Sequence, residues 1–257
     1  MTPNPILKVL STLGLHRVRY LLIGGQACVF YGAAEFSRDT DVALLAEAEN
    51  LQRLSSALEE LQADCIAVPP LDADYLARGH AVHFQCRHPD ARGMRIDVIS
   101  VMRGVAPFEE LWQRRTTLEI PPGFQIELMA LPDLVQAKKT QRDKDWPMIR
   151  RLVEANFVEF RAHPSAEQVG FWLGESRTPE MLLELARQHP DQLAAAIGQR
   201  PLLARAQAGD EAALASELEL EEKRHREEDR AYWMPLRAEL EELRRKRRHD
   251  PKEGAGS

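Results

Sequence analysis

The chain has 257 residues, of which 44% are hydrophobic and 29% are charged, and its formal net charge at pH 7 is −6. This apolar content is enough for a packed core, and the negative charge excludes the electrostatic signature of a non-specific nucleic-acid binder. The cysteines Cys28, Cys65 and Cys86 form no CxxC pair, which argues against a structural zinc site and favours reduced thiols in a cytoplasmic protein. No apolar run is long enough to cross a bilayer, so no membrane contact is expected.

The N-terminal part of the chain alternates helical and strand patterns. Leucines at positions 51, 54, 58 and 61 recur at the spacing of one helix face. Gly24-Gly25 interrupts an apolar run, and Gly32 ends the next apolar segment. These patterns predict helices over residues 5–15, 26–31, 48–63 and 72–78, and strands over residues 18–23 and 40–45.

Two strand pairs and a helix start follow. Val82, Phe84 and Cys86 alternate with polar residues, which is typical of a half-buried strand. Turn-forming residues lie at positions 89–93 and at Pro121-Pro122-Gly123. We therefore expect strands over residues 80–86, 94–101, 116–120 and 124–129, and a helix that starts at residues 131–133.

No strand pattern occurs after about residue 149. Ser165 and Gln168 have the spacing of a capping box, and Asp210 could cap the last helix. Pro235 is expected to interrupt the charged terminal region, because a proline inside a helix costs about 3 kcal/mol. The sequence thus predicts an α/β (α+β) domain over residues 1–150, an all-helical C-terminal region over residues 151–250 and a disordered tail over residues 251–257.

Two aspartates, Asp39 and Asp41, carry the functional interpretation. Side chains i and i+2 of a strand point to the same face, so these carboxylates would lie side by side. Like charges this close repel unless a cation lies between them, and Mg²⁺ takes oxygen ligands from carboxylates and substrate phosphates. Gly24 and Gly25 lie just upstream and could let backbone N–H groups approach those phosphates.

Asp97 is the candidate third carboxylate. It lies between aliphatic residues in the segment Met94-Arg95-Ile96-Asp97-Val98-Ile99, where a charge is costly unless it is paired or bound to a metal. The structural alternative is an ion pair with Arg95 or with an arginine of a neighbouring strand. Because Asp39 and Asp41 are also present, we favour the metal role.

Together these residues resemble the nucleotidyltransferase fold of the DNA polymerase beta superfamily. Gly24-Gly25, Ser37-x-Asp39-x-Asp41 and the later strand residue Asp97 occur in the order typical of that family, within roughly residues 17–152. The similarity is greatest to the minimal nucleotidyltransferases of bacterial antitoxin, toxin and abortive-infection systems. The resemblance implies a mixed sheet flanked by helices, followed here by the helical extension.

The resemblance also implies a reaction, the transfer of a nucleoside monophosphate from an NTP to a hydroxyl acceptor on RNA, protein or a small molecule. In that reaction Gly24 and Gly25 would hold the triphosphate, and Ser37 would bind a phosphate oxygen. Asp39 and Asp41 would ligate two Mg²⁺ ions, and Asp97 would join them at the ion nearest the acceptor, which is the arrangement of two-metal catalysis.

A basic segment after the sheet supplies two further candidates. Lys138 and Arg142 are four residues apart, so on a helix they would share a face. The family resemblance suggests that they point at nucleotide phosphates, where arginine offers a bidentate fork and lysine a point charge. The alternative is a solvated basic helix with Asp143 and Asp145 as ion-pair partners.

An alternative function stays open at this point. The chain could be a non-catalytic or toxin–antitoxin-type interaction module that keeps the fold and holds a partner protein with its helical C-terminal region. Three converging carboxylates favour catalysis, because a pure binder has no physical need for them. The cluster Arg244-Arg245-Lys246-Arg247-Arg248 could touch RNA or favour the negative end of a helix, and we prefer the second interpretation.

Overall fold

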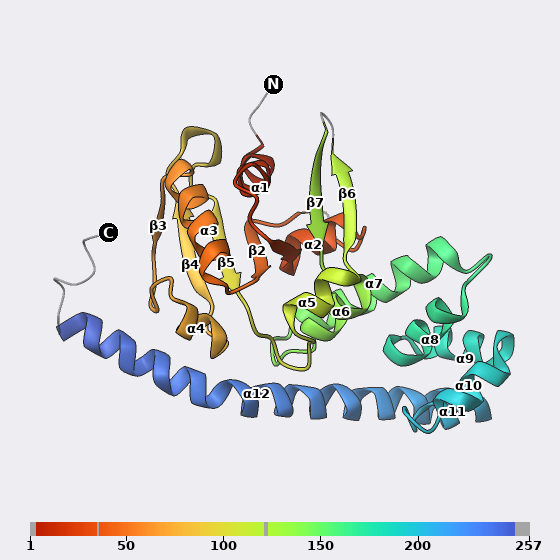
Figure 1. Cartoon of the computed structure of the whole chain (residues 1–257). Coiled ribbons are helices and arrows are strands. Elements are labelled where there is room, and N and C mark those ends of the chain that lie inside the picture. The colour runs from red at the N-terminus through yellow and green to blue at the C-terminus, as the bar shows by residue number, and fades with distance from the viewer. Residues whose placement is uncertain (1–3, 35, 121–122, 250–257) are drawn as a thin grey trace. The chain divides into compact units, whose positions relative to one another are not determined.

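The structure is a computed structural model that describes residues 4–34, 36–120 and 123–249. Within these residues the chain forms twelve α-helices and a mixed seven-stranded sheet, so the predicted α/β class is confirmed (Figure 1). The turn residues Pro121 and Pro122 and the predicted tail at residues 251–257 lie outside the described part of the chain.

The chain divides into two compact units. The described residues of the first unit are 4–29, 36–120, 123–137 and 231–249, and those of the second are 30–34 and 138–230. The sheet belongs to the first unit, and helices alone make up the second. The boundaries at residues 150 and 250 stay predictions.

The sheet has the strand order β3-β4-β5-β2-β1-β7-β6. Strands β2 and β5 pair in parallel, as do β1 and β7, and the other neighbours pair antiparallel. The predicted strand pairs are confirmed, whereas the sequence patterns did not predict β3. The strands are β1 (Tyr20–Ile23), β2 (Asp39–Leu44), β3 (Ala63–Cys65), β4 (Val82–Cys86), β5 (Arg95–Ile99), β6 (Thr116–Ile120) and β7 (Phe124–Leu128).

Apolar helix faces cover the sheet of the first unit. In α1 the side chains of Val9, Leu10 and Leu13 are fully buried, and Asn4 caps this helix by accepting hydrogen bonds from two backbone N–H groups. Helix α1 contacts α3 and β7. The helices here are α1 (Pro5–Leu15), α2 (Gly24–Phe30), α3 (Ala48–Glu60), α4 (Ala73–Ala77), α5 (Phe108–Gln113) and α6 (Leu131–Ala137), with a short 3-10 helix at Pro89–Ala91. Only α5 lacked a sequence prediction.

The second unit packs around Trp172, whose side chain is fully buried. Its indole N–H donates to Asn156 at 2.8 Å, and its ring meets Phe157 edge-on. Ser165 and Gln168 form the predicted capping box. The unit contains α7 (Asp145–Phe160), α8 (Ala166–Glu175), α9 (Pro179–Gln188), α10 (Pro190–Ala196), α11 (Leu203–Ala208) and the first part of α12 (Glu211–His249).

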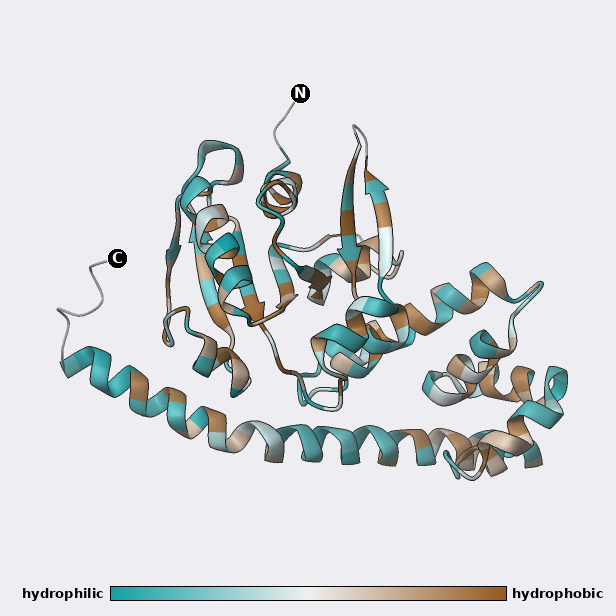
Figure 2. Cartoon of the chain, in the orientation of Figure 1, coloured by the Kyte–Doolittle hydropathy of each residue, from teal (hydrophilic) through white to brown (hydrophobic). Residues whose placement is uncertain are grey.

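Helix α12 continues through Pro235, so the predicted interruption is wrong. Tertiary contacts of the first unit hold the helix beyond the proline: Glu239 lies 2.8 Å from Nε2 of His80 and also binds Arg78. Most of α12 is hydrophilic (Figure 2). Among the helices that the structure describes, none combines the length and the apolar composition that a membrane span requires.

Candidate active site

The turn from β1 into α2 brings two glycine backbones against neighbouring polar side chains. Gly24 has a φ of +66°, a left-handed conformation that glycine adopts without strain. A Cβ atom on Gly24 would lie only 1.9 Å from Oδ2 of Asp41, and one on Gly25 would lie 2.7 Å from Oγ of Ser37. The lack of a side chain at both positions therefore lets the turn sit directly beside Ser37 and Asp41.

The three predicted aspartates lie on one face of the sheet. In the parallel pair of β2 and β5, Asp41 is the register partner of Asp97, and Asp39 is the partner of Arg95. Register partners point to the same face, as do residues two apart on one strand. The intervening residues Thr40 and Ile96 are fully buried on the opposite face. Asp97 thus lies on the face that the metal hypothesis requires.

Asp97 has two partners within the protein. Its Oδ1 accepts a hydrogen bond from Nε of Arg95 at 2.8 Å and lies 2.8 Å from Nδ1 of His83. Burial works to raise the pKa of Asp97, but the hydrogen bonds and charges of His83 and Arg95 outweigh it, so the pKa is lowered. The carboxylate is therefore ionised at neutral pH, and the ion pair with Arg95 that formed the structural alternative is present.

Ser37 connects the glycine turn to the aspartate strand. Its hydroxyl donates a hydrogen bond to the backbone carbonyl of Asp39 at 3.1 Å. The same hydroxyl oxygen is the atom that leaves no room for a Cβ atom on Gly25. Ser37 thus shapes the entry into β2 in this structure, and a phosphate would compete with the Asp39 carbonyl for its proton.

The side chains of Asp39, Asp41 and Asp97 are of the chemical type that binds a divalent cation. Three carboxylates on one face of two adjacent strands supply the oxygen ligands that Mg²⁺ prefers. Within the described residues, however, no group of three His, Cys, Asp or Glu side chains already has the spacing of a metal site. Asp97 directs Oδ1 at Arg95 and His83 instead. Ligation of one ion by all three aspartates would therefore require their side chains to reorient.

Lys138 and Arg142 do not share a helix face, so that prediction is wrong. Helix α6 ends at Ala137 and α7 begins at Asp145, which leaves both residues in the connection. Asp145 is 4% exposed; its Oδ1 lies 3.5 Å from Nζ of Lys138, and its Oδ2 lies 3.0 Å from Nε of Arg142. The same carboxylate accepts the hydroxyl of Thr140 at 2.6 Å. These contacts with one buried carboxylate hold the connection in a loop.

The predicted nucleotide-binding residues thus fall into two groups. Gly24, Gly25 and Ser37 gather with the aspartates in the first unit. Lys138 and Arg142 belong to the second unit, where Asp145 pairs with both. Asp145 was expected as an ion-pair partner if the basic segment only faces solvent, and the structure shows this pairing for both residues.

Two residues near the aspartates were not assigned to the site from the sequence. His83 is the register partner of Asp97 across β4 and β5, and Arg95 is the partner of Asp39. The alternation of Val82, Phe84 and Cys86 placed His83 on the other face of its strand from these apolar residues. Only the pairing of β4 with β5 and of β5 with β2 shows that this face is the one that carries the aspartates.

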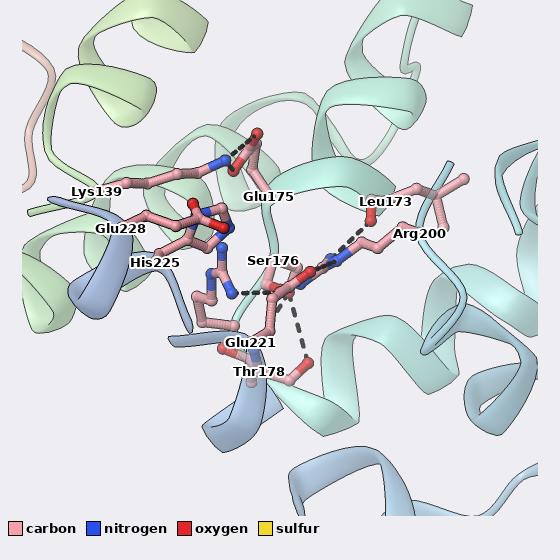
Figure 3. Close-up of polar contacts among 10 residues, drawn as sticks. Lys139, Leu173, Glu175, Ser176, Thr178, Arg200, Glu221, His225 and Glu228 are labelled. Atoms are coloured by element: carbon pink, nitrogen blue, oxygen red, sulfur yellow. Dashed lines mark hydrogen bonds and ion pairs between the residues drawn. The ribbon is translucent and has the colours of Figure 1, made fainter. Parts of the chain in front are cut away.

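The second unit contains a buried ion-pair network that the sequence did not reveal (Figure 3). Glu221 pairs with Arg200 at 2.8 Å and also with Arg177, and Lys139 pairs with Glu175 at 2.8 Å. Burial works to raise the pKa of Glu221, but the hydrogen bond and charge of Arg200, with the charge of Arg177, lower it to about 2. Because each buried charge of this network has an opposite partner, removal of one member would leave an uncompensated charge inside the helical unit.

Comparison of the sequence with known proteins gives no assignment. No protein-family model matches the chain, and no curated protein matches it either. The functional interpretation therefore rests on the motif resemblance and on the geometry described above.

Proposed function

We propose that the chain is a Mg²⁺-dependent nucleotidyltransferase that moves a nucleoside monophosphate from an NTP to a hydroxyl acceptor on RNA, protein or a small molecule. The observation that carries the proposal is the parallel register that sets Asp41 opposite Asp97, with Gly24 packed against Asp41. The motif order shared with the DNA polymerase beta superfamily supplies the reaction class. We also propose a cytoplasmic location, because the widely spaced cysteines are typical of reduced thiols.

Each residue has a role in this proposal. Asp39, Asp41 and Asp97 would hold the cations, which would lower the pKa of the attacking hydroxyl and neutralise the pyrophosphate that leaves when the acceptor oxygen bonds to the α-phosphorus. Gly24 and Gly25 would hold the triphosphate, as the family resemblance implies, and their lack of side chains lets the turn lie directly beside Asp41 and Ser37. Lys138 and Arg142 would contribute only after exchanging Asp145 for phosphate.

A specific observation also supports the alternative of a non-catalytic interaction module. Asp97 already has Arg95 as a counterion, and Asp145 already neutralises Lys138 and Arg142. Such pairs would stabilise the fold without any ligand. In this alternative the helical C-terminal region would hold a partner protein, and the aspartate face would bind no NTP.

Labelling with radioactive nucleotides tests the two functions. The purified chain would be incubated with Mg²⁺, each α-³²P-labelled NTP and RNA, protein or small-molecule acceptors. Asp41→Asn is the test variant, and Asp64→Asn is the matched control, since Asp64 is a half-exposed aspartate of β3 that pairs with Arg87. We expect D41N to reduce labelling at least about 100-fold, as a loss of roughly 3 kcal/mol of transition-state stabilisation would do.

The results separate the proposals. Equal labelling by D41N and the unsubstituted chain would refute the catalytic assignment. Absence of labelling and of Mg-NTP binding, together with co-purification of a partner protein, would support the interaction module. D64N should label as the unsubstituted chain does, because Asp64 lies on the edge strand β3, is separated from Asp97 by β4, and pairs with Arg87.

A further inference from the structure

Arg95 brings a positive charge into the proposed metal site. It lies two residues before Asp97 on β5 and opposite Asp39 on β2. Its Nε donates to Oδ1 of Asp97 at 2.8 Å, and its Nη2 lies 3.1 Å from Nδ1 of His83. Asp41 is the register partner of Asp97 and lies two residues from Asp39, so Arg95 shares one face of the sheet with all three aspartates.

The Arg95 side chain is placed so that it can leave the aspartates. It is 40% exposed, whereas the side chain of Asp97 is 18% exposed. Its strand neighbour Ile96 is fully buried and fixes the backbone of β5. The guanidinium can therefore turn toward water on its flexible stem without a change in the strand.

A guanidinium and a divalent cation would compete at this face. Arg95 uses Oδ1 of Asp97, and a cation shared by the three aspartates would draw on the same carboxylate. A guanidinium and a divalent cation that both contact one carboxylate would repel each other. A positive charge on this face offsets the mutual repulsion of the adjacent carboxylates of Asp41 and Asp97. Arg95 supplies such a charge in the cation-free protein, and a divalent cation would compete with it for Oδ1 of Asp97.

We propose that Arg95 is the internal counterion of the three-aspartate face and that a divalent cation must displace it in order to bind. This inference rests on the proposed function for the assignment of the cation to these aspartates. Arg95 holds the carboxylates together in the cation-free protein and sets the affinity for the metal. It is a positioning residue, because it acts on the metal through Asp97.

Calorimetric titration of the full chain with Mg²⁺ alone tests this role. Arg95→Gln removes the charge and keeps a side-chain amide, Arg95→Lys keeps the charge, and Arg87→Gln removes an equal charge from an exposed pair with Asp64. We expect R95Q to bind Mg²⁺ about tenfold more tightly, which corresponds to about 1.4 kcal/mol, and to have a lower melting temperature without metal. R95K and R87Q should resemble the unsubstituted chain in Mg²⁺ affinity.

Several outcomes would overturn the inference. One is a folded R95Q variant with unchanged or weaker Mg²⁺ affinity, and another is an equal gain in affinity for R87Q, which would indicate a long-range charge effect. If R95Q does not fold without metal, Mg²⁺ should restore its circular dichroism and NaCl of equal ionic strength should not. Failure of Mg²⁺ to restore it would also refute the role of Arg95.

The same experiment stays separate from the test of the reaction, because it uses no NTP. If R95Q binds Mg²⁺ more tightly but the unsubstituted chain transfers no nucleotide, the proposed reaction is refuted and the counterion role of Arg95 is supported. If the unsubstituted chain transfers nucleotide but R95Q has an unchanged Mg²⁺ affinity, the reaction is supported and the counterion role is refuted.

Discussion

Substitution of Gly24 by alanine should destabilise the protein by an amount that the geometry allows us to assign. The φ of +66° at this position costs a residue with a side chain about 1–2 kcal/mol. The new Cβ atom would also lie 1.9 Å from Oδ2, 2.5 Å from Cγ and 2.6 Å from Cβ of Asp41. Relief of such overpacking typically costs about 1–3 kcal/mol. We therefore expect G24A to lower the free energy of unfolding by about 2–5 kcal/mol.

Equilibrium unfolding in urea, followed by circular dichroism, measures this change, and Gly93→Ala is its matched control. Gly93 has a φ of +79° in the same unit, but a Cβ atom there would have no neighbour within 4 Å. G93A should therefore show only the backbone cost, and the difference between the two variants measures the collision with Asp41. The dependence of unfolding free energy on urea should be equal for both variants. If G24A costs no more than G93A, the glycine turn does not pack against Asp41 as described.

Two further predictions concern the helices. Glu221→Gln should destabilise the second unit by about 3–5 kcal/mol at pH 7, because Arg177 and Arg200 lose a buried counterion. Since the folded state lowers the pKa of Glu221 from 4.5 to about 2, about 3 kcal/mol of its contribution is present above pH 4.5 and is lost as the pH falls toward 2. Urea unfolding of both proteins at pH 7, 4 and 3 checks this, and an unchanged difference at pH 3 would contradict it. Pro235→Ala should stabilise α12 by up to about 3 kcal/mol, and hydrogen exchange over residues 231–239 that is no slower in P235A would contradict the prediction.

Much of the secondary structure is determined locally in the sequence. Residues 5–15 form a helix because Asn4 caps it and its apolar side chains recur on one face. Ser165 and Gln168 fix the start of α8 by hydrogen bonds within four residues. Asp39 and Asp41 share a face because strand side chains alternate. In each case the interacting groups are close in the chain, so the sequence pattern already contains the interaction.

Tertiary structure decided the features that depend on distant residues. The pairing of β2 with β5 places Asp97 and Arg95 beside Asp41 and Asp39, and no local pattern fixes that register. Strand β3, with three residues, is stabilised by its pairing with β4. Contacts of Glu239 with His80 support α12 beyond Pro235. Local propensities determined most of the individual elements, whereas pairing across the sheet and burial of charges decided which side chains meet.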